Sequence, residues 1–521
     1  MNKKWIYFLL SSAVFTPVIL HAAPKPQPKF SILATAKGEH QVYPKGTITL
    51  SYTIINNTKY ERTLTFKAIQ GVSQGTGATK PCSSPFTLKP GQDCQLSLVI
   101  HGNSIPSNGI NGGPEICKTI GPGNNNPDQF LCSQPSEEDK LKVTLSPASL
   151  IRRVTVGYTT INGQNTPIAF TSTDGGRSWG PLIQLQSTTA SQLADVTCDD
   201  SGLNCVAVGR TSLFQLISYN STDGGNSWSS PVFPSVLAGA TQSYLNGIAC
   251  DNTGVNCVAV GNSRVPPKTY AVTYTSMDSG ATWSSPILPT PLSGNSTLSG
   301  VACSSSGLQC VAVGTHAGAP ISYSSTSGGA SWSTANILTT QPGFTNTLSS
   351  VSCDSSGLTC SAVGSSFDET TAIPVPVTYT TINGGATWSA PILPAPASNE
   401  DSELYAVSCS NSGLCTATGY VTIGGVFNNL VYTSNNSGNT WSAPILPNIP
   451  QGFDGNSLNG VFCSNDGIFC TTVGSGQTDP SNIFPFSYVS TDGGSSWSSP
   501  LLLTVPSNIL VSNVGNVSGS K

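Results

Sequence analysis

The chain contains 521 residues, which is too many for one small core and indicates two or more domains. Charged residues make up only 9% of it, and the formal net charge is −4. Nucleic-acid binding needs clustered Lys and Arg, so this composition argues against a nucleic-acid partner. Four scattered histidines leave few ligands for zinc, and we expect neither a metal nor a cofactor.

Residues 1–23 have the layout of a secretory signal peptide. Lys3 and Lys4 precede an apolar run over residues 5–20, and small residues follow, ending at Ala23. The run is short for a membrane span, and an uncleaved anchor is the alternative. We therefore predict export, as a secreted, periplasmic or cell-surface protein, with no membrane span once the signal is removed.

Residues 24–147 are predicted to form a separate β-sandwich. Residues 47–55, 62–69 and 94–100 alternate between apolar and polar side chains, as half-buried strands do. The segment FTLKPGQDCQLSLVI is similar to one found in immunoglobulin-like sandwich domains of exported bacterial proteins. No residue pattern in this domain indicates chemistry, so a spacer or docking role is expected.

The whole chain has sixteen cysteines, and in an exported protein an even number predicts disulfides. The four cysteines of the N-terminal domain allow three pairings. We predict Cys82 with Cys94 and Cys117 with Cys132. An insertion over residues 103–138 is rich in Gly, Asn and Pro and is expected to be an irregular surface loop.

Residues 148–521 contain a repeat that ends in tryptophan. Its clearest copies are STDGGRSW, STDGGNSW and STDGGSSW. The spacings between successive tryptophans are 49, 55, 49, 56, 53 and 56 residues, and this period of about fifty indicates a repeat architecture. The seven tryptophans are Trp179, Trp228, Trp283, Trp332, Trp388, Trp441 and Trp497.

Each copy has the chemistry of a tight turn. Ser or Thr followed by Asp or Asn can hydrogen-bond to nearby backbone, and the next Gly accepts positive φ. The Asp position holds Ser327, Asn383 and Asn436 in three copies, so a charge is not required there. The pattern resembles the Asp-box, or BNR, repeat of sialidase-like β-propellers.

A typical unit, residues 193–234, divides into four short strands, and seven such units predict an all-β, seven-bladed propeller of four-stranded antiparallel blades. Six units carry two cysteines that would clamp the hairpin between their first and second strands. A loop of this size contributes about 2.5 kcal/mol per bridge. The predicted pairs are Cys198–Cys205, Cys250–Cys257, Cys303–Cys310, Cys353–Cys360, Cys409–Cys415 and Cys463–Cys470.

The first unit lacks a first strand and has Arg153 in the place of its second cysteine. The segment NILVSN, residues 508–513, aligns with the first strands of other units and places Asn513 at the missing first cysteine. We therefore predict that the C-terminal segment supplies the first strand of the first blade and closes the ring. Closure also removes sheet edges that invite aggregation.

Loops of unequal length fall on the end of the propeller opposite the cysteine hairpins and Asp-boxes, and insertions in repeat proteins commonly mark the binding face. Asp368 and Glu369 in one loop, and Glu400, Asp401 and Glu403 in the next link, could meet a basic partner or a divalent cation. The alternative is that they are solvated loop acids. The aromatic and basic candidates for contact are Tyr244, Arg264, Tyr270, Phe367, Tyr405, Tyr420, Phe453 and Phe484.

These features predict a monomeric, exported module that binds a protein or a carbohydrate without catalysis. The alternative is a secreted glycoside hydrolase, either sialidase-like or built on a carboxylate pair. Sialidases with Asp-boxes use three arginines and a tyrosine nucleophile on a six-bladed propeller, and the sequence shows no matching arginine motif. The resemblance therefore implies the fold over about 370 residues but not the active site.

Overall fold

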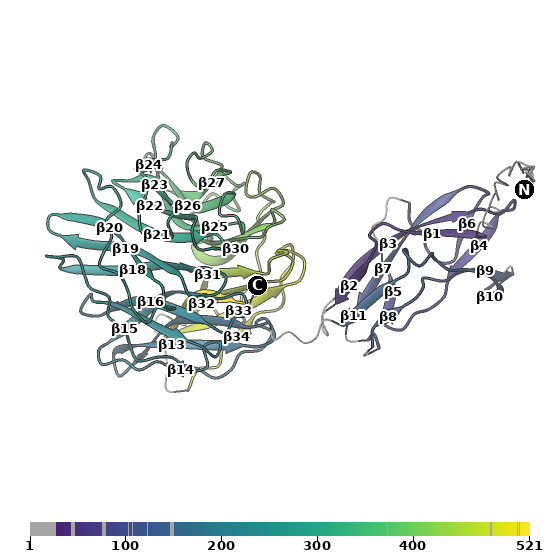
Figure 1. Cartoon of the computed structure of the whole chain (residues 1–521), viewed down its shortest axis with the longest axis horizontal. Helices are drawn as coiled ribbons and strands as arrows, with labels where there is room; N and C mark the ends of the chain where they lie inside the picture. The colour runs from purple at the N-terminus through teal and green to yellow at the C-terminus, as the bar shows by residue number, and fades with distance from the viewer. Residues whose placement is uncertain are drawn as a thin grey trace, which may run out of the picture. The chain divides into compact units, whose positions relative to one another are not determined.

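The computed structural model describes residues 28–42, 47–75, 80–102, 104–106, 108–121, 123–145, 151–371, 373–479, 482–507, 509 and 511–520. Every regular element in these residues is a β-strand, which confirms the predicted all-β class. No helix in this part of the chain is long and apolar enough to cross a membrane. The chain divides into two compact units, Met1–Ser149 and Leu150–Lys521 (Figure 1). The predicted signal peptide lies outside the described residues.

The N-terminal unit packs three sheets around one core, which runs from Phe30 to Val143 and includes Leu64, Leu98 and Ile116. The first sheet has the order β1 (Phe30–Ala34), β3 (Thr47–Asn56), β7 (Asp93–His101) and β5 (Val72–Gln74). The second has the order β10 (Asn124–Ser133), β9 (Ile116–Gly121), β4 (Arg62–Phe66) and β6 (Phe86–Leu88). The third contains β2 (Glu39–Val42), β11 (Lys142–Leu145) and β8 (Ile110–Asn111).

The expectation of an irregular loop over residues 103–138 is wrong. Half of this segment forms β8, β9 and β10, and β9 and β10 make an antiparallel hairpin in which Cys117 lies directly opposite Cys132. The predicted disulfides Cys117–Cys132 and Cys82–Cys94 are both present. The first half of β10, NNNPD, is polar and mostly exposed, so its composition resembles that of a loop although its backbone pairs with β9.

The C-terminal unit contains seven antiparallel sheets, which we number in chain order. Sheet 1 has the order β14 (Ile183–Gln184), β13 (Gln164–Ser172), β12 (Arg153–Ile161) and β35 (Ser512–Gly519). Sheet 2 contains β15 (Ser191–Cys198), β16 (Cys205–Thr211) and β17 (Leu216–Ser221); sheet 3 contains β18 (Gln242–Cys250), β19 (Cys257–Val265) and β20 (Lys268–Ser276). Sheet 4 contains β21 (Ser296–Cys303), β22 (Cys310–His316), β23 (Ala319–Ser325) and β24 (Asn336–Ile337).

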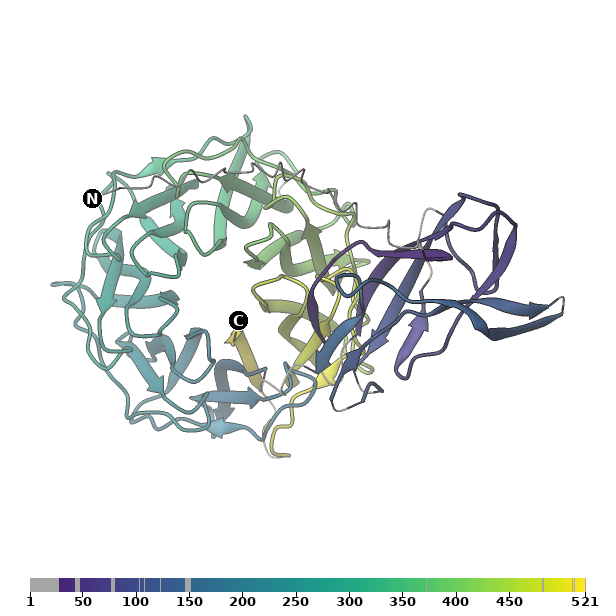
Figure 2. The ribbon, with the colours of Figure 1, turned by 45° about the vertical axis from the view of Figure 1, so that its right-hand side comes forward.

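The remaining three sheets follow the same order. Sheet 5 contains β25 (Phe344–Cys353), β26 (Cys360–Asp368) and β27 (Pro374–Thr381); sheet 6 contains β28 (Ser402–Cys409), β29 (Cys415–Ile423) and β30 (Val426–Ser434). Sheet 7 contains β31 (Gly455–Cys463), β32 (Cys470–Asp479), β33 (Asn482–Ser490) and β34 (Leu501–Leu502). The sheets are arranged radially as a propeller (Figure 2). Their first strands contact one another in a closed cycle: β35, β15, β18, β21, β25, β28, β31 and β35 again.

The predicted fourth strand is shorter than expected. It has two residues in sheets 1, 4 and 7, and it is a single bridge in the others, such as Ser218 with Val232 and Thr273 with Ile287. Proline explains this, because Pro286 and Pro289 flank Ile287 and cannot donate to a ladder.

The six predicted disulfides of the repeats are all present, at the first pair of sheets 2 to 7. The hairpins that they clamp lie at the same end of the sheets as the tryptophan turns, because the two loops hydrogen-bond to each other. Gly224 N donates to Leu203 O and Gly493 N donates to Ile468 O, both at 2.9 Å. We call this end of the propeller the cysteine end, and the opposite end the variable end.

The ring closes as predicted, with β35 paired antiparallel to β12, but the predicted register is wrong. Gly519, not Asn513, lies opposite Arg153. Gly519 therefore corresponds to Cys198 of sheet 2, which lies opposite Cys205. The segment VGNVSG therefore matches the first strands of the other sheets. Both segments contain a Val–Ser pair like that of LSSVSC, but VGNVSG also has an apolar residue three positions before its second valine, as the other first strands do, whereas NILVSN has Asn508 there.

Arg153 replaces the missing disulfide. Its side chain is fully buried, lies 4.8 Å from the Phe462 ring centroid, and donates to Thr471 Oγ1 of sheet 7 and to Ser520 O beyond β35. One long side chain thus ties β12 both to the C-terminal segment and to the neighbouring sheet.

The predicted turn chemistry of the repeat is confirmed. In the first copy, Ser172 Oγ accepts from Gly176 N at 2.8 Å, and Asp174 Oδ1 accepts from Ser178 N at 2.8 Å. Asn436 Oδ1 makes the same bond to Thr440 N at 2.9 Å, which is why a carboxylate is not needed. The Asp and Asn side chains are thus used within their own turns.

Candidate functional site

The structure gathers part of the predicted site into one group at the variable end of sheet 6, which we call the aromatic–acidic cluster: Asp401, Glu403, Tyr405, Tyr420 and Phe427. Glu403 pairs across the sheet with Tyr420, and Tyr405 occupies the bulge that follows Leu404. The ring centroids of Tyr405 and Tyr420 are 5.6 Å apart, and those of Tyr420 and Phe427 are 5.0 Å apart in an edge-to-face contact. Phe427 is 52% exposed.

The electrostatics of this cluster follow from its partial burial. Burial raises the pKa of Glu403, and the neighbouring Asp401 carboxylate raises it further. Burial also raises the pKa of Tyr420 to about 12, with Glu403 and Asp401 contributing, and it raises the pKa of Tyr405. The carboxylates and the phenol oxygens are therefore close enough to repel one another when charged.

Glu400, another of the predicted contact residues, accepts hydrogen bonds from the backbone of a neighbouring hairpin. Its carboxylate accepts from Gly424 N at 2.8 Å and Gly425 N at 3.0 Å, at the tip of the hairpin between β29 and β30. Both glycines have positive φ, 61° and 78°. The contact holds the hairpin that carries Phe427, so Glu400 is a positioning residue for the cluster.

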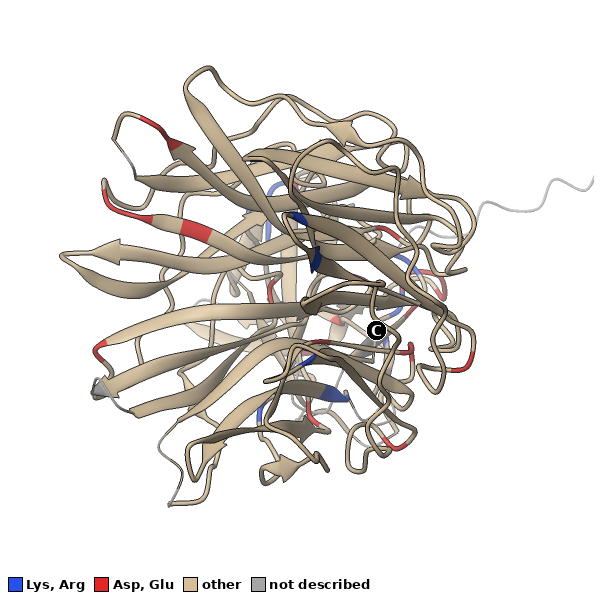
Figure 3. Cartoon of the chain, turned by 90° about the vertical axis from the view of Figure 1, so that its left-hand side faces the viewer, with Lys and Arg blue, Asp and Glu red and all other residues tan. Residues whose placement is uncertain are grey.

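Asp368 and Glu369 are not part of this cluster. Asp368 ends β26 in sheet 5 and accepts from Thr370 N at 2.8 Å within its own loop. Hydrogen bonds from the Thr370 hydroxyl and backbone lower the pKa of Asp368. Figure 3 shows acidic residues on loop tips at both ends of the sheets and few basic ones, so acidity is spread over the propeller.

Tyr244 lies in a second group at the variable end, with two residues that the sequence analysis missed. The Arg210 guanidinium stacks 4.3 Å from the Tyr244 ring centroid, and the Phe214 ring lies 5.9 Å from that of Tyr244. Gln192, with its amide oriented to accept, takes two N–H donors from Arg210. Phe214 has a φ of 59°, an unusual conformation for a bulky residue in a hairpin turn.

The remaining candidates are separate from these two groups in the described contacts. Arg264 and Tyr270 lie on the hairpin of β19 and β20, where Arg264 pairs with Thr269 and Ser263 pairs with Tyr270. Phe453 packs edge-to-face against Phe486, at 6.0 Å, and belongs to a core cluster of sheet 7. Phe367 is 41% exposed at the end of β26, and Phe484 lies in β33.

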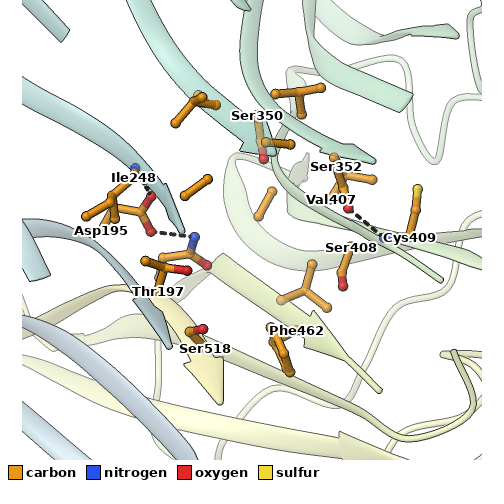
Figure 4. A pocket seen from close by; sticks show the side chains of 18 of the residues that line it. Asp195, Thr197, Ile248, Ser350, Ser352, Val407, Ser408, Cys409, Phe462 and Ser518 are labelled. Carbon is orange, nitrogen blue, oxygen red and sulfur yellow. Dashed lines mark hydrogen bonds between the residues drawn. The ribbon is translucent and has the colours of Figure 1, made fainter. Parts of the chain in front are cut away.

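A cavity of about 450 Å³ lies on the propeller axis, and the sequence analysis did not predict it. The first strands of all seven sheets line it, chiefly with small polar side chains (Figure 4). Two of its lining residues are acidic, Asp195 and Asp354. Asp195 accepts from Ile248 N and Asn516 Nδ2 at 2.8 Å and thereby links three sheets. Burial raises the pKa of Asp195 to about 6, although these donors and Val196 N lower it. The other sheets have Gly, Ala, Ser or Asn in its place, a signal that the sequence contained.

The candidate metal chemistry is limited among the described residues. The single group of three or more His, Cys, Asp or Glu ligand atoms within 4.8 Å of one another is Glu115, Cys117 and Cys132. Its two cysteines form a disulfide, so they offer no thiolate to a metal.

No protein-family model and no curated protein matches this chain. Among solved structures, it is similar to the GH74 xyloglucanase from Xanthomonas campestris, with a TM-score of 0.37 and 16% identity over 66% of this chain and 58% of that one. It is similar to a PL25 ulvan lyase, with a TM-score of 0.46 and 8% identity over 67% of this chain and 92% of that one. YCF48 from Cyanidioschyzon merolae gives a TM-score of 0.37 and 17% identity over 60% and 87%. Similarities this distant carry no activity over to this chain.

Proposed function

We propose that this chain is an exported protein that binds a protein or a glycan outside the cytoplasm, without catalysis, through the variable end of a seven-bladed Asp-box propeller. The N-terminal unit would be an immunoglobulin-like sandwich that acts as a spacer or docking module. Eight disulfides support an oxidising compartment, since such bonds persist outside the cytosol. The repeated Ser–Asp turn supports the Asp-box assignment.

The observation that carries the binding role is the placement of half-exposed rings beside charges at the variable end. Tyr420 and Phe427 lie beside Glu403 and Asp401, and Tyr244 lies beside Arg210. Aromatic residues and Arg are enriched in protein interfaces, and rings also stack on sugars. The two groups lie in different sheets, so a ligand that met both would cross the mouth of the ring.

A glycan array and a panel of extracellular proteins from the same source test this proposal. The purified chain should bind members of one panel, and Phe427→Ala with Arg210→Ala should weaken that binding by about tenfold or more. Ser178→Ala, at the cysteine end, is the matched control and should bind normally. Loss of binding in the control alone, or no binding in either panel, would contradict the proposed role.

A secreted glycoside hydrolase is the second candidate, and the pair Asp401 and Glu403 favours it. A carboxyl group with a raised pKa beside a second carboxylate is the arrangement of a general acid and its partner. A sialidase-like site has less support, because Arg153 is buried at the seam and Arg177 stacks on Phe469 at the cysteine end. Turnover of a chromogenic glycoside that Glu403→Gln abolishes would establish the hydrolase.

A further inference from the structure

The aromatic–acidic cluster places rings beside carboxylates, since Glu403 pairs with Tyr420 across the sheet. Tyr405, Tyr420 and Phe427 form a continuous row of ring contacts. Phe427 also lies beside sheet 7. A Cβ atom added to Gly455, the first residue of β31, would be 3.8 Å from the Phe427 side chain. The faces of aromatic rings are electronegative and attract cations, most strongly where water is partly excluded. Rings and carboxylates thus favour the same kind of ligand.

The carboxylates of this half of the ring have no Lys or Arg nearby in the sequence. Residues 269–520 contain eleven Asp and Glu and no Lys or Arg. These residues contain all but the first residue of β20 in sheet 3, the whole of sheets 4 to 7, and β35. A half-buried carboxylate such as Glu403 is costly without a positive partner, and burial is what raises its pKa. A positive group from outside sheets 4 to 7 would relieve this cost.

The cluster is also held in place before any ligand arrives. Leu404, between Glu403 and Tyr405, is fully buried in the core of sheet 6. Glu400 fixes the tip of the hairpin that carries Phe427 through two backbone N–H groups. Because few side chains need to be ordered on binding, the entropic cost of forming a complex is low.

We propose that the aromatic–acidic cluster binds the side-chain cation of a Lys or Arg residue on a partner protein. The cation would lie against the Tyr420 and Phe427 rings and form hydrogen bonds to Glu403 and Asp401. Two carboxylates are too few for Ca²⁺, which takes six to eight oxygen ligands, whereas an ammonium has three donors. This inference rests on the proposed binding function and narrows it to one kind of partner.

The test uses fluorescence anisotropy of the full chain with a fluorescein-labelled pentalysine peptide and its fully acetylated analogue. We expect the lysine peptide to bind, with an affinity that falls as NaCl rises, and the acetylated peptide not to bind. Glu403→Gln removes the charge with little change of shape, and Phe427→Ala truncates an exposed ring. Each should weaken binding by roughly tenfold.

Two variants separate this site from general attraction to an acidic protein. Asp368→Asn removes one charge from the neighbouring sheet, and Phe367→Ala truncates a similarly exposed ring there; both should bind within about twofold of the original chain. Equal weakening by Asp368→Asn and Glu403→Gln, or binding of the acetylated peptide, would overturn the inference. Binding of a neutral glycan that Phe427→Ala abolishes would also overturn it, while leaving the broader binding function intact.

Discussion

At the scale of single residues, the indole N–H groups of five of the seven repeat tryptophans join neighbouring sheets. Trp283 donates to Ser218 of the preceding sheet at 2.8 Å, and Trp388 donates to Ser322 at 2.8 Å. The equivalent acceptor position in sheet 1 holds Ala169, which has no hydroxyl. Among the described residues, Trp228 Nε1 is buried and makes no hydrogen bond. Those five tryptophans are therefore cross-links between sheets as well as apolar anchors, whereas Trp497 donates to Gly494 O within its own turn.

Ala169→Ser should supply the acceptor that Trp228 lacks. Ala169 is fully buried in the same core cluster as Trp228, so a hydroxyl there replaces an unsatisfied donor with a hydrogen bond. We expect a gain of about 1 kcal/mol in the free energy of unfolding, seen as a rise in Tm. Ser218→Ala, the reverse change one sheet along, should lower Tm. A lower Tm for Ala169→Ser would contradict this account.

Asp195 should make stability depend on pH. Its pKa is about 6 in the folded chain and about 3.9 when unfolded, so the folded state binds more protons between these values. Stability should therefore fall as pH rises from about 4 to 6, by at most about 3 kcal/mol. Thermal unfolding across this range measures the slope, which Asp195→Asn should reduce. Asp195→Asn should also lower stability at every pH, because the NH₂ group of the new amide would face the Ile248 N–H donor. The slope is therefore the measurement that decides, and an unchanged slope would contradict the role of Asp195.

At the scale of the strand, one glycine in each sheet permits the bulge of the first strand. Register shifts occur at Leu298 and Gly300 in sheet 4 and at corresponding places in the other sheets. Opposite this bulge, a Cβ atom on Gly314 would lie 2.0 Å from Thr297 O, and one on Gly419 would lie 1.9 Å from Glu403 O. The repeated glycine after CVAV is thus needed for close backbone approach rather than for a turn.

Gly314→Ala should therefore destabilise the propeller, because backbone cannot yield as a flexible side chain would. We expect a loss of about 1–3 kcal/mol, measured as a lower Tm. Gly180→Ala, between β13 and β14 of sheet 1, is the control, since its Cβ would be 3.5 Å from Thr171 O, an ordinary contact. Similar Tm values for the two variants would show that the bulge tolerates a side chain.

The strands also show what the sequence could and could not predict. The tryptophan spacing and paired cysteines were sufficient for the ring and its disulfides, because each unit repeats the same local chemistry. The register of β35 was missed by six residues, since the Val–Ser pair of the first strands occurs twice in succession, at residues 511–512 and 517–518. Phe427 was overlooked, although Gly424 and Gly425 before it are a hairpin signal. Which acids gather around Glu403 depends on contacts between strands, and sequence spacing does not reveal those.

At the scale of the whole molecule, the propeller depends on β35. Val514 and Val517 are buried in the core between sheets 1 and 7, and Arg153 bonds to Ser520 O. Six sheets have disulfides near the axis, whereas sheet 1 has noncovalent contacts alone at the corresponding pair. We therefore expect the seam between β12 and β35 to open more readily than the other strand pairs of the ring.

A chain that ends at Pro506 should lose the ring. Removing two buried valines costs about 3–6 kcal/mol, and the exposed edge of β12 invites aggregation, so Tm should fall by roughly 10 °C or more. The control is a rearranged chain in which residues 509–520 come directly before Arg152. A copy of the hairpin loop of residues 199–204 joins the two segments. This permuted chain should regain the original Tm. A truncated chain that kept the original Tm and stayed monomeric would show that the seam between β12 and β35 is not needed for the stability of the propeller.

The pairing of β35 with β12 also orders events during synthesis. Arg152 and Ser520 make a hydrogen bond although they are 368 positions apart in the chain. The hairpins of the middle sheets can form as they leave the ribosome, but β12 must wait for its partner until translation has passed residue 519. A chaperone that shields this strand in the nascent chain would therefore act for almost the entire time that the propeller is being made.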